Sequence, residues 1–270
     1  MRKPKAPELP AQQAAARLYE AHQRRERFAP LPAGLAPRSA GEGYAIQDAY
    51  VALRAARLGP LAGYKIALSS PEMQRFVGVD APQAGVILRS QVRRTPAVIR
   101  ASDYVRLLVE FEVGVEIGED LPAADAPFAR ERIVQAVGAV MPAIEIADDR
   151  DADYSRLSQH PYDLIADNGW NEGAVLAEPA RDWKSLDLAQ VLGAAKINGE
   201  IVGEGRGEAA MGHPLDAVAW MAGHLASLGR GLLRGEIVIT GSLITSKTAK
   251  AGDHIEFALA GLGKAELTVE

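Results

Sequence analysis

Two glutamates, Glu110 and Glu112, stand two residues apart in the segment 107–117, LLVEFEVGVEI. Side chains alternate between the two faces of a β-strand, so both carboxylates share one face while apolar residues fill the other. Two carboxylates about 4 Å apart repel each other by roughly 4 kcal/mol at an effective dielectric near 20, so such a pair requires solvent, a shared proton or a cation. The segment therefore suits either a divalent metal site or the solvated face of an amphipathic strand, which Glu116 continues.

Other polar residues lie in places that favour chemistry. Glu145 is on a short, apolar strand predicted over residues 143–147. Lys65 lies within another predicted strand, where a buried ammonium requires a partner unless it reaches solvent from a sheet edge. Asp167 and Asn168 open an Asp-Asn-Gly turn, which is a turn signal first and a functional loop second.

The remaining residue types narrow the chemistry further. The five histidines show no metal-site spacing, and we expect His213 to begin a helix, with a polar role near the site. There is no Gly-x-Ser-x-Gly motif for serine chemistry and no cysteine for disulfides or thiolate catalysis. The glycine cluster at 203–207 follows an Asn-Gly turn and carries Glu and Arg between its glycines, which indicates a flexible turn and not a nucleotide-binding loop.

Composition limits the partners. The chain has 270 residues, of which 48% are hydrophobic, and this supports a substantial buried core. Its 30 basic and 35 acidic residues are intermixed and give a net charge of -5, so nucleic acid is not an expected partner. The first residues lack the apolar run of a secretory signal, and no segment is apolar enough to span a bilayer. We therefore expect no membrane association and a cytoplasmic location.

The elements that must position these residues follow from the pattern of apolar residues and turn signals. Helices are predicted over 11–27, over 43–58, over 73–77, from a cap at Asp125 to Val140, and from His213 to Gly229. Strands are predicted over 61–68, 107–117, 143–147, 236–240, 255–259 and 265–269, with a hairpin over 195–202 that turns at Asn-Gly. Because most strands are joined by hairpins, the pattern favours an α+β fold with a mixed sheet, divided into an N-terminal helical region (1–78) and a larger domain (79–270).

Seven segments in this order resemble the 2-keto-4-pentenoate hydratase and 4-oxalocrotonate decarboxylase family of the fumarylacetoacetate hydrolase superfamily. They are GYKIALSSPEMQ, VEFEVGVEI, PAIEIADDR, IADNGW, MGHPLDAVAWMAGHLASLG, VITGSL and AGDHIEF. The similarity covers nearly the whole chain. It implies a helical N-terminal region attached to a mixed β-roll, which agrees with the predicted elements.

The resemblance also implies roles for individual residues. Glu110 and Glu112 match the family's Glu-x-Glu metal motif, and Glu145 matches its third carboxylate, with Mg²⁺ or Mn²⁺ as the expected ion and no other cofactor. Lys65 matches the lysine that lines the pocket and is expected to move a proton or bind the substrate carboxylate. The catalytic set is completed by the Ala-Asp-Asn loop, at Asp167 and Asn168, and by the turn before the long helix, at His213.

The function implied is a hydratase that adds water to 2-hydroxypenta-2,4-dienoate or a longer relative, as in the lower steps of aromatic-ring catabolism. Decarboxylation of a 2-oxo-3-enedioate is the main alternative, because it passes through the same type of stabilised dienolate. An acylpyruvate hydrolase, or a non-catalytic subunit in a complex with a neighbouring pathway enzyme, stays open as well. Ala67 and the residues 169–171, Gly-Trp-Asn, depart from the family pattern and leave the substrate undefined. The family usually forms homo-oligomers.

Overall fold

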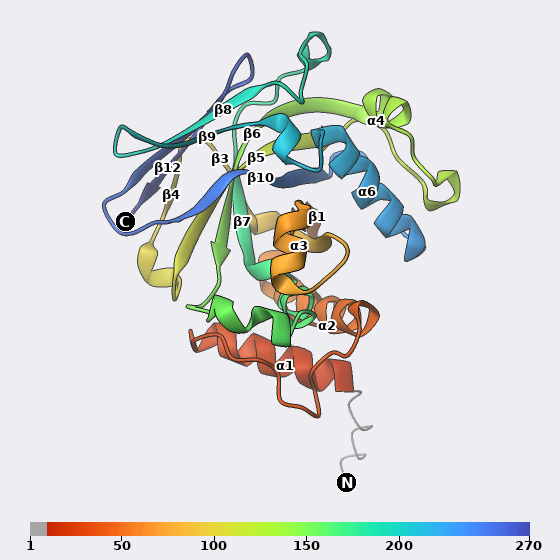
Figure 1. Cartoon of the computed structure of the whole chain (residues 1–270), viewed down its shortest axis with the longest axis vertical. Helices are drawn as coiled ribbons and strands as arrows, with labels where there is room; N and C mark the ends of the chain where they lie inside the picture. Colours follow the sequence, from red (N-terminus) through yellow and green to blue (C-terminus); the bar gives the residue numbers. More distant parts are fainter. Residues whose placement is uncertain (1–9) are drawn as a thin grey trace.

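The protein, described here by a computed structural model over residues 10–270, has two sheets and a group of helices at one end. Figure 1 shows α1 and α2 stacked beneath the curled sheets, while α6 and α4 lie beside the opposite end. Within residues 10–270 the α-helices are α1 (Pro10–Gln23), α2 (Ala40–Leu58), α3 (Pro71–Val77), α4 (Arg130–Ala136), α5 (Asp163–Ala166) and α6 (Pro214–Ser227). None of these helices is long and apolar enough to cross a membrane.

The larger sheet has seven strands in the order β2-β1-β10-β5-β6-β7-β3. Two of its pairings, β1 with β10 and β3 with β7, are parallel, and the others are antiparallel. Its strands are β1 (Leu61–Ala67), β2 (Gln83–Leu88), β3 (Val92–Arg94), β5 (Leu107–Ile117), β6 (Val137–Asp148), β7 (Asn171–Leu176) and β10 (Ile237–Thr248). The sheet is therefore mixed, as the sequence predicts.

The smaller sheet has five strands in the order β4-β12-β11-β8-β9. They are β4 (Ala97–Ile99), β8 (Leu192–Ile197), β9 (Glu200–Arg206), β11 (His254–Leu259) and β12 (Gly263–Val269). The predicted hairpin is confirmed, since Asn198 and Gly199, with φ of 54° and 86°, join β8 to β9. Both residues adopt the positive φ that a type I′ turn requires.

The alternation predicted for residues 107–117 decides which way the acidic side chains of β5 point. Val109, Phe111 and Val113 are fully buried, and the Phe111 ring lies 5.4 Å from that of Phe257 on the smaller sheet. This apolar face of β5 therefore forms the core between the two sheets. Because side chains alternate along a strand, Glu110 and Glu112 face the other side of the larger sheet.

One predicted element is wrong. The helix predicted from Asp125 to Val140 is only α4, and the chain enters β6 at Val137. Residues 137 and 139–141 are buried, because β6 crosses the core between β5 and β7. Pro142, two residues after the predicted helix end, lies inside the strand opposite Val113, and Asp125 provides no cap because α4 begins after Ala129 without a side-chain cap.

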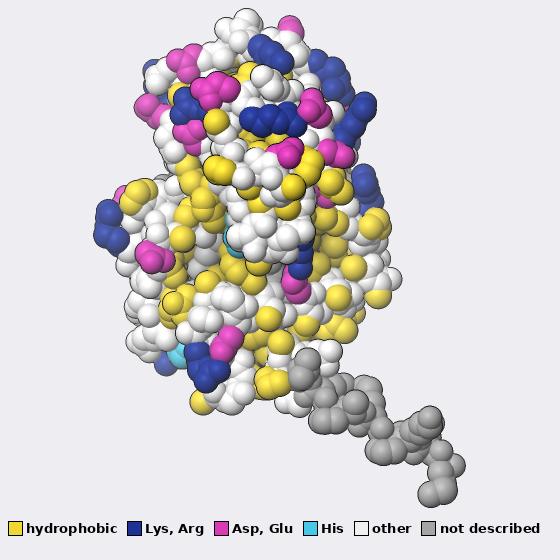
Figure 2. All heavy atoms as spheres, turned by 90° about the vertical axis from the view of Figure 1, so that its right-hand side faces the viewer, with side chains coloured by type: hydrophobic (Ala, Val, Ile, Leu, Met, Phe, Trp, Pro, Cys, Tyr) yellow, Lys and Arg dark blue, Asp and Glu magenta, His cyan; other side chains and the backbone are white. Residues whose placement is uncertain are grey.

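The other predicted helices, now α1, α2, α3 and α6, agree with prediction to within a few residues, whereas the short α5 was not predicted. Ser39 caps α2 by accepting a hydrogen bond from the Glu42 N–H, so α2 begins at Ala40. The division of the chain at residue 78 stays a prediction; β1, which precedes it, pairs with β10 inside the larger sheet. On the face drawn in Figure 2, acidic and basic side chains lie side by side, mostly toward the end away from α1.

Candidate metal centre and active site

Three carboxylates converge on the face of the larger sheet that points away from the inter-sheet core. Glu110 on β5 lies directly opposite Glu145 on β6, and Glu112 lies opposite Ala143. One oxygen from each of the three glutamates lies within 4.8 Å of the others, and we call Glu110, Glu112 and Glu145 the carboxylate cluster. Glu116, on the same face of β5, instead pairs with Arg181 at 3.2 Å, outside the cluster.

The two fully buried members of the cluster each have one oxygen bound by the protein and one oxygen left without a partner. The Gly241 N–H donates to Glu112 Oε2 at 2.7 Å, and Asn171 Nδ2 donates to Glu145 Oε1 at 2.9 Å. Glu112 Oε1 and Glu145 Oε2 have no hydrogen-bond donor among the described residues. A buried carboxylate oxygen without a partner is strongly unfavourable, and oxygen ligands of this kind are those that Mg²⁺ and Mn²⁺ prefer. The residues therefore fit a hard divalent cation.

The electrostatics of the cluster agree with this fit. Burial, together with the neighbouring charge of Glu145, raises the pKa of Glu110 to about 7. Burial and the charges of Glu145 and Glu110 raise the pKa of Glu112 well above its usual range. The three carboxylates are thus close enough to resist ionising together, and a cation between them would remove that penalty.

Lys65 reaches the cluster from β1. Its Nζ lies 3.1 Å from Glu145 Oε1 and donates to Gly169 O at 3.3 Å. Burial alone would lower the pKa of Lys65, but the charges of the cluster outweigh it and raise that pKa, so Lys65 is a cation at neutral pH. Glycine at position 85 makes room for its stem, because a Cβ there would lie 2.8 Å from Lys65 Cγ.

The predicted pair Asp167 and Asn168 is buried beside the cluster. Asp167 forms ion pairs with His22, at 2.6 Å, and with Arg150. The Asn168 side chain accepts from the Val86 N–H at 2.7 Å and donates to Val86 O at 2.9 Å, which fastens the loop to β2. These contacts hold the backbone that delivers Gly169 O to Lys65, and a direct catalytic role of either residue stays a prediction.

His213 lies at the N-terminus of α6. Its Nδ1 accepts a hydrogen bond from the Leu215 N–H at 3.0 Å, so the predicted helix start is confirmed. Burial and the nearby charge of Arg130 lower the pKa of His213, and the acids that face it are Asp216 and Asp187. None of its described contacts joins His213 to the carboxylate cluster, and its catalytic role stays a prediction.

Sequence reasoning missed three groups that complete the site. Asn171 and Gly241 each donate a hydrogen bond to the cluster, and His22 on α1 contacts the Asp167 side chain. Asn171 had a usable signal, since it is one of the departures from the family pattern. Gly241 lies in the matched segment VITGSL, but nothing in that segment assigned it a role, and His22 had no signal; their contacts reach across 129 and 145 residues of sequence.

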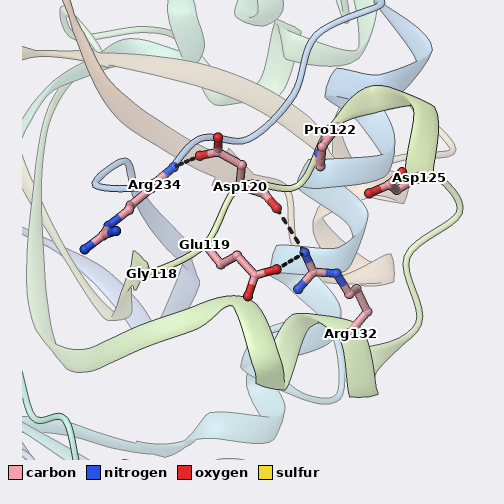
Figure 3. Close-up of a pocket in the computed structure, with 7 residues that line it drawn as sticks. All are labelled: Gly118, Glu119, Asp120, Pro122, Asp125, Arg132 and Arg234. Carbon is pink, nitrogen blue, oxygen red and sulfur yellow. Dashed lines mark hydrogen bonds and ion pairs between the residues drawn. The ribbon is translucent and has the colours of Figure 1, made fainter.

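A separate surface pocket lies at the far ends of these strands and shares no residue with the cluster. Figure 3 shows Arg132 reaching toward Glu119 and the backbone of Asp120, and the bonds measure 2.8 and 3.0 Å. The lining residues are Gly118, Glu119, Asp120, Pro122, Asp125, Arg132 and Arg234. Asp120 Oδ1 also accepts from the Arg234 backbone N–H at 2.7 Å, and the pocket lining includes none of the residues predicted for metal binding or catalysis.

Comparison with known proteins identifies the family of the chain. Residues 64–270 match the model of the fumarylacetoacetate hydrolase C-terminal family. The chain belongs to the fumarylacetoacetate hydrolase family. Among the curated relatives of this family member, 2-keto-4-pentenoate hydratase of Paraburkholderia phymatum is 33% identical over 92% of this chain and 93% of its own. The 2-hydroxyhexa-2,4-dienoate hydratase of Comamonas testosteroni is 31% identical over 92% of each chain.

Solved structures of the family share the fold. The 4-oxalocrotonate decarboxylase from Pseudomonas putida G7, complexed with calcium and acetate, superposes with a TM-score of 0.87 at 23% identity and covers 96% of this chain and 97% of its own. The fumarylpyruvate hydrolase from Pseudomonas aeruginosa, in complex with Mn²⁺ and pyruvate, gives a TM-score of 0.60 at 13% identity, over 76% and 88% of the two chains. The predicted fold, helical at the N-terminus with a curled β-roll, is confirmed.

Proposed function

We propose that the protein is a metal-dependent hydratase that adds water to 2-hydroxypenta-2,4-dienoate or a related 2-hydroxydienoate and releases a 4-hydroxy-2-oxo acid. The observation that carries the proposal is the carboxylate cluster with two buried, unpartnered oxygens beside a buried lysine. Hydratases of this kind are among the relatives at 31–33% identity over nearly the full chain, which supports this substrate class.

Glu110, Glu112 and Glu145 would hold the divalent ion, with Mg²⁺ or Mn²⁺ as the expected metal. When bound, the ion supplies Lewis-acid stabilisation of the negative charge that develops on the 2-oxygen of the substrate. Three carboxylates and a divalent ion carry a formal charge of -1, and the Lys65 ammonium brings the site to neutrality. The site can then accept a small carboxylate without excess repulsion.

Lys65 has a third N–H besides the two that face Glu145 and Gly169. This N–H is the group we assign to the substrate carboxylate. Because its pKa is raised, Lys65 retains its proton and is better suited to binding an anion than to donating a proton to carbon. In the overall reaction the dienol loses its hydroxyl proton, carbon 5 gains a proton, and water adds its hydroxyl group to carbon 4 and its other hydrogen, as a proton, to carbon 3.

The experiment that tests this function is a panel of 2-hydroxydienoates and 2-oxoenedioates, followed by ultraviolet absorbance with and without added Mg²⁺ or Mn²⁺. Metal-dependent loss of the dienol without release of carbon dioxide supports the hydratase. Stoichiometric release of carbon dioxide from an enedioate, with no turnover of the dienols, contradicts it.

The decarboxylase is the second candidate function. The fold likeness to 4-oxalocrotonate decarboxylase, at a TM-score of 0.87, favours it, but the sequence identity is lower than for the hydratases. The same panel separates the two activities. Assembly into a homo-oligomer and a complex with a neighbouring pathway enzyme stay predictions, which light scattering of the purified protein and of mixtures would test.

A further inference from the structure

The loop of residues 167–172, which runs past the carboxylate cluster, has a strained backbone. Asn168, Gly169 and Trp170 all have positive φ, at 54°, 56° and 60°. Positive φ is natural for glycine but unfavourable for Asn168 and Trp170, and such conformations persist only where surrounding contacts impose them. The loop therefore depends on anchors outside itself.

Both acidic ends of this loop are anchored, and one histidine lies between them. His22 Nε2 lies 2.6 Å from Asp167 Oδ1, and His22 Nδ1 lies 3.4 Å from Glu172 Oε1. Arg150 also forms an ion pair with Asp167 at the first end of the loop. At the other end of the loop, Arg54 Nη2 lies 2.5 Å from Glu172 Oε2. The His22 ring thus joins the first residue of the loop to its last.

The chemistry of imidazole decides which form of His22 can make this bridge. A neutral imidazole has a single N–H, whereas the imidazolium has two. Because each ring nitrogen faces a carboxylate, only the imidazolium donates toward both ends of the loop. The protonated ring is therefore the form that fits the structure.

The loop delivers two groups to the site. Its middle supplies Gly169 O, which accepts from Lys65 at 3.3 Å, and its end supplies Asn171 Nδ2, which donates to Glu145 Oε1 at 2.9 Å. These two contacts set which Glu145 oxygen is bound by the protein and which is left unpartnered. A change at the ends of the loop is thereby transmitted to the carboxylate cluster.

We propose that His22 is a positioning residue of the metal centre, whose imidazolium ties Asp167 to Glu172 and so holds Asn171 and Gly169 in place. This role rests on the proposed metal-dependent function. It also gives the N-terminal helices a part in the active site, since His22 on α1 and Arg54 on α2 both precede residue 64, where the match to the family model begins.

The charges around the ring agree with this role. Burial alone would lower the pKa of His22, but Asp167 and Glu172 outweigh it and raise that pKa to about 8. The cations facing the same acids are Arg54 and Arg150, and the Tyr50 ring packs 5.3 Å from the imidazole. Because the raised pKa belongs to the folded state, the bridge is present at pH 7 and is lost as the pH rises through about 8.

The test is the affinity for Mg²⁺ alone, measured by titration calorimetry from pH 7.5 to pH 9 without substrate. Deprotonation of carboxylates can only strengthen Mg²⁺ binding over this range, so a fall in affinity has the opposite sign to the ordinary effect. We expect the affinity to fall about tenfold as His22 deprotonates, the size typical of losing a group that supports a metal ligand. In His22→Gln the affinity is expected to be low at pH 7.5 and nearly independent of pH.

His254→Gln is the matched control, because His254 is an exposed histidine on β11, and it should keep the wild-type profile. If His22→Gln does not fold, the wild-type protein still provides the test: the His22 ring, followed by NMR, must titrate at the same pH at which the Mg²⁺ affinity falls. A flat wild-type affinity through pH 8, an unchanged fall in His22→Gln, or midpoints that differ would each overturn the proposal. Inactivity toward every dienoate would remove the proposed hydratase alone, whereas no Mg²⁺ binding at any pH would overturn both.

Discussion

The described residues contain two clusters of possible metal ligands, and only one of them has the properties of a metal site. The carboxylate cluster and a second group, His254, Glu256 and Glu266, each bring three ligand atoms within 4.8 Å of one another. We call the second group the surface cluster. It lies on β11 and β12 of the smaller sheet, where His254 is exposed and both glutamates are partly exposed. Spacing alone therefore does not distinguish the two.

The two clusters differ in the groups, other than a metal ion, that pair with their carboxylates. In the surface cluster Lys264 Nζ lies 3.1 Å from Glu256 and 2.9 Å from Glu266, and its hydrogen bond lowers the pKa of Glu256. In the carboxylate cluster burial raises the pKa of Glu110 and Glu112, and one oxygen each of Glu112 and Glu145 has no donor within residues 10–270. Lysine and solvent already satisfy the carboxylates of the surface cluster, so a bound cation would stabilise them little. The acids of the carboxylate cluster lack such partners, so a bound cation would stabilise them much more.

The largest expected effect comes from neutralising the acids of the carboxylate cluster. Glu110→Gln, Glu112→Gln and Glu145→Gln should each lower metal-dependent turnover by roughly 10³-fold or more, since about 4 kcal/mol of charge stabilisation at the transition state depends on the ion. Steady-state kinetics at saturating metal measures this. Glu112→Gln should also leave the metal-free fold at least as stable, because it removes a carboxylate that burial disfavours.

Glu116→Gln is the control for these variants. Glu116 lies on the same strand face but binds Arg181 near solvent, so its replacement should leave turnover within about twofold. An equal loss in all four variants would contradict the assignment of the carboxylate cluster.

Added Mg²⁺ should stabilise the wild-type protein against unfolding but should not stabilise Glu112→Gln, the variant of the carboxylate cluster. At a free Mg²⁺ concentration a hundred times its dissociation constant, binding to the folded state adds about 2.7 kcal/mol, which raises the melting temperature by several degrees. Differential scanning calorimetry of the wild type, of Glu112→Gln and of Glu256→Gln distinguishes the clusters. A melting shift that survives in Glu112→Gln but is absent in Glu256→Gln would assign the ion to the surface cluster and reverse the comparison.

Sequence reasoning located the carboxylate cluster because its members follow local rules and match family motifs. Period-two alternation placed Glu110 and Glu112 on one face, and the predicted strand that carries Glu145 is present within β6. The strand order was not predictable in the same way. The pairing of β5 with β6 that sets Glu110 opposite Glu145 depends on contacts across 35 positions of sequence, which no local pattern specifies.

The errors have the same physical origin. A cap at Asp125 and a stop at Met141-Pro142 predict a helix through residues 137–140, but burial on both sides of β6 overrides these local signals. Asn171 and His22 are polar residues whose partners are known only once the chain is folded, so their types alone carried no assignment. Local sequence patterns were enough to place the two acids that share strand β5. They were not enough to place side chains that meet only when distant segments fold together.

A smaller effect is expected from pH. Because burial raises the pKa of Glu110 to about 7 in the metal-free protein, protons compete with the ion for this carboxylate below that pH. The apparent Mg²⁺ affinity should therefore fall about tenfold for each pH unit below 7, and calorimetry in two buffers of different ionisation enthalpy should register the protons released on binding. An affinity that is constant from pH 7 to pH 5 would mean that the ion binds acids with ordinary pKa values, such as those at the surface.

The smallest effect is expected at the surface cluster itself. Lys264→Met removes the cation that satisfies Glu256 and Glu266, and because exposed ion pairs contribute little, the melting temperature should stay within about 2 °C of the wild type. The number of bound Mg²⁺ ions per chain, measured by equilibrium dialysis, should stay at one, since solvent replaces the lost ammonium at Glu256 and Glu266 but cannot reach the buried oxygens of Glu112 and Glu145. A second tightly bound ion in Lys264→Met would mean that the lysine, and not solvent exposure, is what keeps a metal from the surface cluster.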